Sequence, residues 1–378
     1  MFCFKKSPYP WAFLLSFLSF LSLFSFEIKG VWVTRWELYS PEKIESIVDS
    51  LSIANVTDAY VQIYGSGYAF FNSKIAPVKY KDFDPLEIFI QKAHSKNIKV
   101  HAWVNLLYMW DRREMVDDDK HILKRYPTSV LVDDKNISLL DYSLEMIKER
   151  NIEGFYVSPS SDIVKDYILF LIDEVLFNYN IDGIHLDYSR FPGREFVYDI
   201  FLRSNFIQKF LVDPFEIKSE NSLKIFGEKG VNALLNEWQN FPKEELKSLI
   251  KEIYFLVKNH NPNIQLSSAV FADVDIASSN YYQNWWEWLN EGCIDYVVIM
   301  AYSPSISVLK KQLDKIQNKT TLSKVVVGVA SYNQTVYNMS NNVRELYNYP
   351  VLGFCIFSNQ SLFDQKGSYS YVGKTIFK

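Results

Sequence analysis

Residues 181–192 read Ile-Asp-Gly-Ile-His-Leu-Asp-Tyr-Ser-Arg-Phe-Pro, and this stretch decides the fold. Its apolar and β-prone residues indicate a short buried strand, which begins after an Asp-Gly turn and ends at Phe-Pro-Gly. Residues 162–178 are helix-like, so the local order is helix, tight turn, strand. In a parallel α/β barrel the C-terminal strand ends carry the chemistry, and Asp187 would lie at such an end. A capping or salt-bridged Asp187 is the alternative interpretation.

Strand-like runs alternate with helical stretches along the rest of the chain. Most of the strand-like runs are dense in Val, Ile and Tyr, as strands buried on both faces require. The expected strands cover residues 28–36, 58–64, 98–105, 181–188, 264–272, 294–302, 324–330 and 351–358. The expected helices cover residues 41–53, 85–96, 162–178, 243–259, 284–291 and 308–317. This alternation predicts a closed (β/α)₈ TIM barrel, with residues 154–158 as a possible extra strand.

Two connections of the predicted barrel are long. Residues 106–152 follow the third strand, and residues 192–263 follow the fourth. Long loops at the catalytic face commonly shape a substrate cleft. No Gly/Ser-rich or Pro-rich linker and no internal repeat divides the sequence, so residues 27–378 are expected to form a single domain.

The first 26 residues are expected to be a targeting segment. Lys5 and Lys6 precede an apolar run at residues 11–26, which is shorter than the roughly 20 residues of a membrane-spanning helix. We expect a signal peptide cleaved near Ser25 or, alternatively, an uncleaved N-terminal membrane anchor. Either segment predicts an exported protein that is periplasmic, associated with the cell envelope or secreted.

Composition and spacing narrow the classes of partner and cofactor. The formal net charge is −4 and no basic stripe is present, so nucleic acid is not an expected partner. No Cys-x-x-Cys or His-x-x-x-His spacing occurs, so neither a metal site nor another cofactor is expected. Cys293 and Cys355 are expected as buried free thiols, with a disulfide as the alternative. A monomer is expected because no helix shows an exposed apolar stripe.

The predicted strand ends are rich in aromatic, amide and charged side chains. Carbohydrate sites need these types, because aromatic faces pack on the C–H surfaces of sugars and polar groups bind the hydroxyls. The aromatic content of 16% is in keeping with such a site. The expected substrate-binding residues are Arg35, Trp36, Tyr64, Trp103, Asn105, His185, Arg190 and Tyr302.

Hydrolysis of a glycosidic bond usually needs two carboxyl groups. One protonates the leaving oxygen, and the other attacks the sugar or activates water. Asp187 is the candidate nucleophile or stabilising base. The candidate acids are Asp273, at the end of the neighbouring fifth strand, and Glu37, after the first strand. Asp273 could instead cap the next helix, and Glu37 could pair with Arg35.

The same segments resemble the glycosyl-hydrolase-like family ten, a family of exported bacterial TIM-barrel proteins. Residues 182–192 resemble its Asp-Gly-Ile-His-hydrophobic-Asp-Tyr-x-Arg-Tyr-Pro signature, and Lys-Gly-Val-Trp at 29–32 resembles its opening Arg-Gly-Val-Trp strand. Weaker matches follow in order at 83–86, 101–105, 158–167, 266–270 and 294–302. Leu106 stands where the family commonly has Pro, and Ala272 where many members have Gly. The resemblance implies hydrolysis of bacterial glycans, with cell-wall polysaccharide as a natural target.

Three functions are compatible with these patterns. We expect a glycoside hydrolase acting on a bacterial glycan, with peptidoglycan glycan strands as one candidate substrate. The alternative is a non-catalytic carbohydrate-binding TIM barrel of the cell envelope, and a weaker one is an envelope scaffold. A chitinase mechanism is disfavoured, because Ser189 stands where the similar chitinase motif has its acidic Glu.

Overall fold

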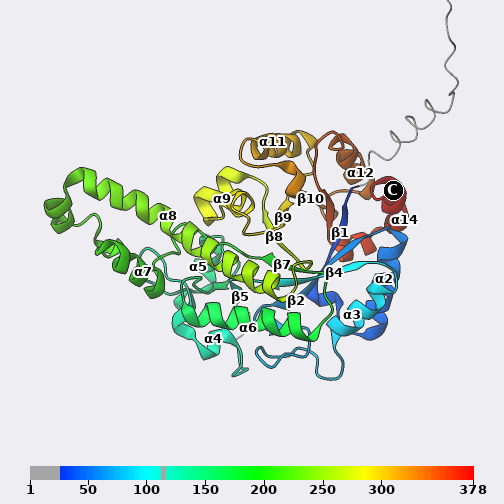
Figure 1. Cartoon of the computed structure of the whole chain (residues 1–378), viewed down its shortest axis with the longest axis horizontal. Coiled ribbons are helices and arrows are strands. Elements are labelled where there is room, and N and C mark those ends of the chain that lie inside the picture. Colours follow the sequence, from blue (N-terminus) through cyan, green and yellow to red (C-terminus); the bar gives the residue numbers. More distant parts are fainter. Residues whose placement is uncertain (1–25, 112–115) are drawn as a thin grey trace, which may run out of the picture.

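Eight parallel strands close into a barrel in the computed structural model, which describes residues 26–111 and 116–378 (Figure 1). The strands are β1 (Ile28–Val33), β2 (Asp58–Gly65), β4 (Lys99–Asn105), β7 (Gly183–Asp187), β8 (Gln265–Phe271), β9 (Tyr296–Met300), β10 (Val325–Ala330) and β11 (Gly353–Phe357). β1 pairs with both β2 and β11, which closes the sheet. The predicted (β/α)₈ barrel is therefore confirmed. The expected targeting segment lies outside the described residues, apart from Phe26.

Helices cover the outside of the barrel (Figure 1). They are α2 (Pro41–Ile53), α3 (Pro85–His94), α6 (Asp162–Asn178), α8 (Glu220–His260), α9 (Val274–Tyr281), α10 (Trp285–Asn290), α11 (Ile306–Gln317), α12 (Val336–Glu345), α13 (Asn359–Phe363) and α14 (Ser368–Thr375). α2 begins where Ser40 accepts a hydrogen bond from the Lys43 amide, with Pro41 at the first helical position. Within the described residues, none of these helices has both the length and the apolar character that crossing a membrane requires.

The connection from β4 to β7 builds a small subdomain over the barrel mouth. It contains β5 (Tyr108–Trp110), α4 (Ile122–Arg125), α5 (Leu144–Glu149) and β6 (Phe155–Tyr156). β5 pairs antiparallel with β6 in a separate two-stranded sheet, so the extra strand expected at residues 154–158 is present but lies outside the barrel. A further short strand, β3 (Tyr68–Ala69), pairs with the end of β2.

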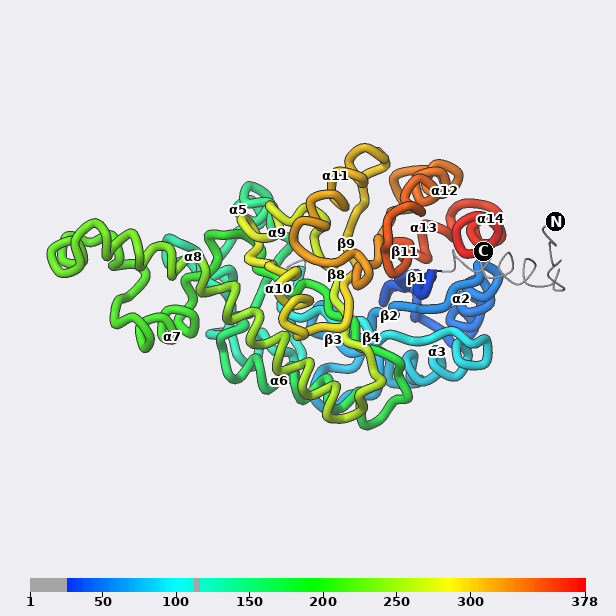
Figure 2. The backbone as a smooth tube through the Cα atoms, turned by 45° about the horizontal axis from the view of Figure 1, so that its top comes forward, coloured from blue at the N-terminus to red at the C-terminus, as the bar shows by residue number. Residues whose placement is uncertain are grey.

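The connection from β7 to β8 forms a helical arm. α7 (Ile200–Phe210) and the first part of α8 extend away from the barrel, on the side opposite α14 (Figures 1 and 2). Gly227 interrupts α8 with a φ of 66°, a conformation that glycine adopts without steric cost. The second part of α8 returns along the barrel and packs against α6.

Polar side chains share the barrel interior with aromatic ones. His101 Nε2 lies 2.8 Å from Asp58 Oδ1, and both side chains are almost fully buried. Higher in the barrel, Trp32 Nε1 donates to His185 Nε2 over 3.0 Å, and His185 Nδ1 lies 2.8 Å from Ser267 Oγ. Because Nε2 accepts, the neutral ring carries its proton on Nδ1. These interactions make the barrel a packed core rather than a channel.

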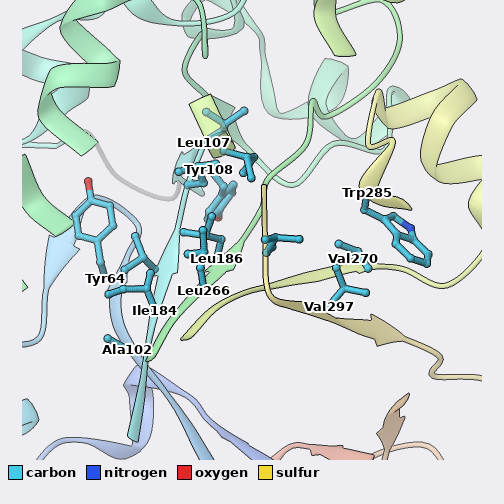
Figure 3. Close-up of a cluster of buried hydrophobic side chains, with 14 of the residues drawn as sticks. Tyr64, Ala102, Leu107, Tyr108, Ile184, Leu186, Leu266, Val270, Trp285 and Val297 are labelled. Carbon is cyan, nitrogen blue, oxygen red and sulfur yellow. The ribbon is translucent and has the colours of Figure 1, made fainter. Parts of the chain in front are cut away.

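Apolar side chains fill the layer between the strands and the helices. Figure 3 shows part of this cluster, with Trp285 and Val270 labelled. Trp285, Trp286 and Trp288 are all buried on α10, as packing residues. Cys293 and Cys355 are buried and unpaired, as expected.

Candidate active site

A cavity of about 470 Å³ opens at the C-terminal end of the barrel strands. Its lining combines carboxylates, guanidinium groups, amides and aromatic rings. The lining residues are Thr34, Arg35, Trp36, Gln62, Trp103, Asn105, Tyr108, Asp111, Glu153, Asp187, Tyr188, Arg190, Met300, Tyr302 and Phe357.

Asp187 ends β7 and is partly exposed to this cavity. Its Oδ1 accepts a hydrogen bond of 2.7 Å from the Tyr188 amide. Burial raises the pKa of Asp187 to about 6, although the Tyr188 amide and the positive charge of Arg190 act in the opposite direction. The Trp103 indole also lowers this pKa, yet its Nε1 makes no hydrogen bond of normal geometry within the described residues. Asp187 therefore exchanges its proton near neutral pH.

The backbone after Asp187 is strained. Tyr188 has a φ of 51°, in the left-handed region that costs a non-glycine residue about 1–2 kcal/mol. Its ring stacks on Tyr108 with centroids 4.6 Å apart, which helps to hold this conformation. The turn aims the Tyr188 amide at the Asp187 carboxylate, so local strain and the position of the carboxylate are linked.

Glu153 provides a second carboxylate from the loop that precedes β6. Arg190 Nη2 donates to Glu153 Oε1 over 2.7 Å, and the Tyr156 hydroxyl donates to Oε2 over 2.9 Å. Burial alone would raise the pKa of Glu153, but the charge and hydrogen bond of Arg190 outweigh it and lower the pKa. Glu153 is therefore ionised over the pH range in which Asp187 titrates.

Arg190 is 5% exposed and is enclosed by aromatic rings. Its guanidinium carbon lies 4.8 Å from the ring centroid of Tyr188, 5.0 Å from that of Phe271 and 5.3 Å from that of Tyr281. Cation–π contacts of this kind favour a guanidinium over an ammonium group. The arginine is thereby fixed beside Glu153, and its charge lowers the pKa of both Glu153 and Asp187.

Three N–H groups in the cavity lining have no partner among the described residues. They are Trp103 Nε1, Asn105 Nδ2 and Arg190 Nε. The Asn105 Oδ1 accepts from Gln62 Nε2 over 3.2 Å, and Gln62 Oε1 accepts from Arg35 Nη1 over 3.0 Å. The Asn105 amide is thus oriented with its donor unused, and buried donors usually find acceptors. Sugar hydroxyls are acceptors of the required kind.

Flat aromatic faces surround the same cavity. Tyr302 and Phe357 stack with ring centroids 5.4 Å apart. The Trp36 ring is 63% exposed, and the Arg35 guanidinium lies 4.2 Å from its centroid on one face. Rings of this kind suit the apolar face of a pyranose.

Six of the eight predicted binding residues line the cavity, and two do not. The six are Arg35, Trp36, Trp103, Asn105, Arg190 and Tyr302. Tyr64 is fully buried outside the barrel, with its hydroxyl 3.4 Å from that of Tyr167, because the register shifts between Gln62 and Tyr64. His185 lies inside the barrel, within the packed core beneath the cavity, where it is 0% exposed.

Of the predicted catalytic carboxyls, only Asp187 lines the cavity. Asp273 caps α9, with Oδ1 accepting from the Asp275 and Ile276 amides, and it pairs with Lys315 at 3.4 Å. Glu37 is 2% exposed and accepts a hydrogen bond from Asn359 Nδ2 over 2.6 Å. Both side chains are occupied structurally, and neither lies in the cavity lining.

Sequence reasoning missed several lining residues, of which Glu153 and Asp111 matter most for chemistry. Glu153 directly precedes the short β-like run at 154–158, and that position was its one detectable signal. Asp111 follows β5 in the same subdomain. Within the described part of the chain, no three His, Cys, Asp or Glu side chains are grouped as metal ligands would be.

An eight-stranded parallel barrel with carboxylates and aromatic rings at its C-terminal mouth defines a TIM barrel whose candidate site lies where this fold places its active sites. The family described as Glycosyl hydrolase-like 10 matches residues 27–344, and the chain belongs to this family. The predicted resemblance is confirmed.

Two curated relatives carry related names. Glycosyl hydrolase YngK of Bacillus subtilis (strain 168) is 23% identical over 288 residues, covering 68% of this chain and 48% of the relative. Glycosyl hydrolase DigH of Escherichia coli (strain K12) is 20% identical over 319 residues, covering 75% of this chain and 64% of the relative. The chain thus matches between about half and two thirds of the length of these relatives.

Solved structures share the fold at low identity. The β-galactosidase Gan42B has a TM-score of 0.63 at 12% identity, with 93% of this chain and 57% of that chain covered. The catalytic domain of the Paenibacillus polymyxa β-amylase has a TM-score of 0.60 at 9% identity, with 94% and 99% covered. At this identity the likeness concerns the fold alone.

Proposed function

We propose that the protein is a glycoside hydrolase that cleaves a bacterial glycan, with peptidoglycan glycan strands as its substrate. Asp187 acts as the general acid, and Glu153 acts as the base or nucleophile. The observation that carries the proposal is the presence of two carboxylates with different surroundings in the lining of one cavity. Burial raises the pKa of Asp187 to about 6, whereas the pairing with Arg190 lowers that of Glu153. Environments that push two carboxyl pKa values apart are typical of acid–base pairs.

The two roles follow from the protonation states. Below about pH 6 Asp187 holds a proton that it can give to the glycosidic oxygen as the bond breaks. Glu153 is anionic in the same range and can attack the anomeric carbon or take a proton from water. This assignment gives Asp187 the acid role, whereas the sequence had suggested that of nucleophile or base.

The remaining lining residues bind the sugar. Trp36, Tyr302 and Phe357 offer faces for pyranose rings, and the unpartnered donors of Trp103 and Asn105 take hydroxyl oxygens. Because these groups surround Asp187, binding also positions the reacting bond. The printed names of the curated relatives, both glycosyl hydrolases, support this proposal.

Export of the protein is part of the same proposal. A peptidoglycan substrate lies outside the cytoplasmic membrane, and the positive and apolar character of residues 1–26 supports transport to it. Fractionation of expressing cells and N-terminal sequencing of the protein test this part, and a cytoplasmic protein that retains Met1 would overturn it.

Product release from glycans tests the hydrolase directly. Purified protein is incubated with denuded peptidoglycan and with a panel of α- and β-glucans, and reducing ends and product masses are measured. We expect release by the wild type and by Asp273→Asn, since Asn also caps a helix well, and none by Asp187→Asn. Equal release by Asp187→Asn and the wild type would overturn the assignment.

A carbohydrate-binding barrel without catalysis is the second candidate. The observation that favours it is the pairing of Glu153 with Arg190 and Tyr156, which is also what a purely structural carboxylate would show. No release from any glycan, together with retained binding to one of them, would select this function.

A further inference from the structure

A second cavity of about 340 Å³ lies next to the candidate active site. Tyr281 lines the second cavity, and the centroid of its ring lies 5.3 Å from the guanidinium carbon of Arg190, which lines the first. The same two chain segments contribute to both cavities, since Glu153 follows Asn151 and Arg190 precedes Pro192 by two residues. The two cavities share no lining residue, so a glycan that occupies both has to extend past Tyr281.

The charges in the second cavity are unbalanced. Arg150 Nη1 lies 3.4 Å from Glu195 Oε1, and these side chains are 31% and 24% exposed. Arg194 is exposed, and within the described residues its guanidinium has neither an ion pair nor a hydrogen bond. Two guanidinium groups and one carboxylate leave one positive charge here, in a chain whose formal net charge is −4.

We propose that this second cavity is a subsite for a carboxylate-bearing sugar of the glycan, with Arg194 as its principal ligand and Arg150 as support. The proposal rests on the proposed function, because it places the charged sugar beside the bond to be cleaved. A guanidinium matches a carboxylate with two parallel hydrogen bonds, and one net positive charge matches a single negative charge. A neutral glucan offers the unpaired arginine hydroxyl oxygens but no charged partner.

The expected contribution of Arg194 is moderate. Hydrogen bonds between charged groups are worth more than neutral ones, but exposure to water and salt weakens them. We therefore expect a change of roughly tenfold in affinity, the lower end of the range for charge-assisted pairs. The effect should appear in KM and not in kcat, since Arg194 lies outside the lining of the catalytic cavity.

The experiment compares one glycan in two forms. Oligosaccharides with free carboxylates are measured beside the same oligosaccharides after conversion of those carboxylates to neutral amides. The variants are Arg194→Gln and, as a matched loss of one positive charge, Lys218→Gln on the helical arm. We expect Arg194→Gln to raise KM about tenfold for the acidic form only, and Lys218→Gln to change neither form. Equal behaviour of Arg194→Gln and the wild type, or an equal loss on both forms, would overturn the subsite.

Equilibrium binding separates this proposal from the hydrolase itself. The acidic and amidated oligosaccharides are titrated into Asp187→Asn with and without the added Arg194→Gln change, so that no turnover is needed. Preference for the acidic form that disappears with Arg194→Gln supports the subsite even if no glycan is cleaved. Absence of that preference overturns it even if cleavage occurs. A sugar phosphate and a uronic acid are also compared, at equal concentration, as competitors of the acidic oligosaccharide. Stronger displacement by the sugar phosphate would overturn the assignment of the subsite to a carboxylate.

Discussion

Arg190 Nη2 lies 2.7 Å from Glu153 Oε1, and this contact joins the end of β7 to the loop before β6. Arg190 also lowers the pKa of Asp187, three residues earlier in the chain. One buried guanidinium therefore acts on both carboxylates of the proposed catalytic pair. For Asp187 the effect of burial is larger than that of Arg190, so its pKa is raised. For Glu153 the direct pairing with Arg190 outweighs burial, so its pKa is lowered.

The pH profile of activity should reflect this arrangement. With Asp187 as the acid, kcat/KM should fall about tenfold per pH unit above roughly pH 6, as its carboxyl loses the proton. Glu153 must be ionised, so the acidic limb should lie below the ordinary pKa of Glu. In Arg190→Gln the pKa of Glu153 should rise and move the acidic limb to higher pH. Rates measured from pH 3 to 9 check both limbs, and an acidic limb that does not move in the variant contradicts the role of Arg190.

Asp187→Asn should make the protein more stable at neutral pH while removing activity. The folded pKa of Asp187, about 6, exceeds the usual 3.8, so the folded state holds its proton more tightly than the unfolded state does. Its contribution to stability is complete below about pH 3.8 and is lost as the pH rises through 6. Asn keeps the acceptor for the Tyr188 amide without the charge, and we expect a gain of about 1–2 kcal/mol at pH 7.5 after allowance for solvent exposure. Urea unfolding at pH 7.5 measures it, and a clear loss of stability contradicts the burial argument.

His185 should make the protein sensitive to mild acid. Burial holds the pKa of His185 well below its usual 6.5, so below that pH the unfolded state binds a proton that the folded state does not. Stability should therefore decrease by up to about 1.4 kcal/mol per pH unit as the pH falls from 6.5. Unfolding free energies of the wild type and of His185→Asn are compared between pH 7.5 and 5. If both proteins lose stability at the same rate, His185 is not the group responsible.

Trp103→Phe should impair catalysis more than folding. Trp103 Nε1 makes no hydrogen bond of normal geometry within the described residues, so the folded protein loses packing and only a weak interaction of the indole with Asp187. Loss of a donor to the substrate should reduce kcat/KM by about threefold to tenfold. The indole also lowers the pKa of Asp187, so the alkaline limb of the pH profile should move to higher pH. A variant with an unchanged alkaline limb would show that the indole does not act on Asp187.

The barrel strands could be predicted from the sequence because strands buried on both faces are marked by dense apolar runs. The cavity residues could be predicted where such a strand is regular up to its end, as at Trp103 and Asn105 on β4. Tyr64 was misplaced because a register shift on β2 turns it out of the barrel, and no local signal marks that shift.

Asp273 and Glu153 show why the second carboxyl of the site could not be identified from the sequence alone. Asp273 follows a strand and precedes a helix, and a helix cap and a catalytic carboxylate look the same in that position. Glu153 comes from a long connection, and its place beside Arg190 depends on the pairing of β5 with β6 and on contacts between residues 37 positions apart. Spacing along the chain carries no information about such contacts.

The most direct test of the catalytic pair is kcat/KM on one cleaved glycan at pH 5 for the wild type, Asp187→Asn, Glu153→Gln and Asp111→Asn. All three carboxyls line the cavity, so the variants differ only in which one is neutralised. The pair proposed here predicts a loss of at least about a hundredfold for Asp187→Asn and for Glu153→Gln, and less than about tenfold for Asp111→Asn. Full activity of Glu153→Gln, with a collapse of activity in Asp111→Asn, would contradict it and assign the second carboxyl to Asp111.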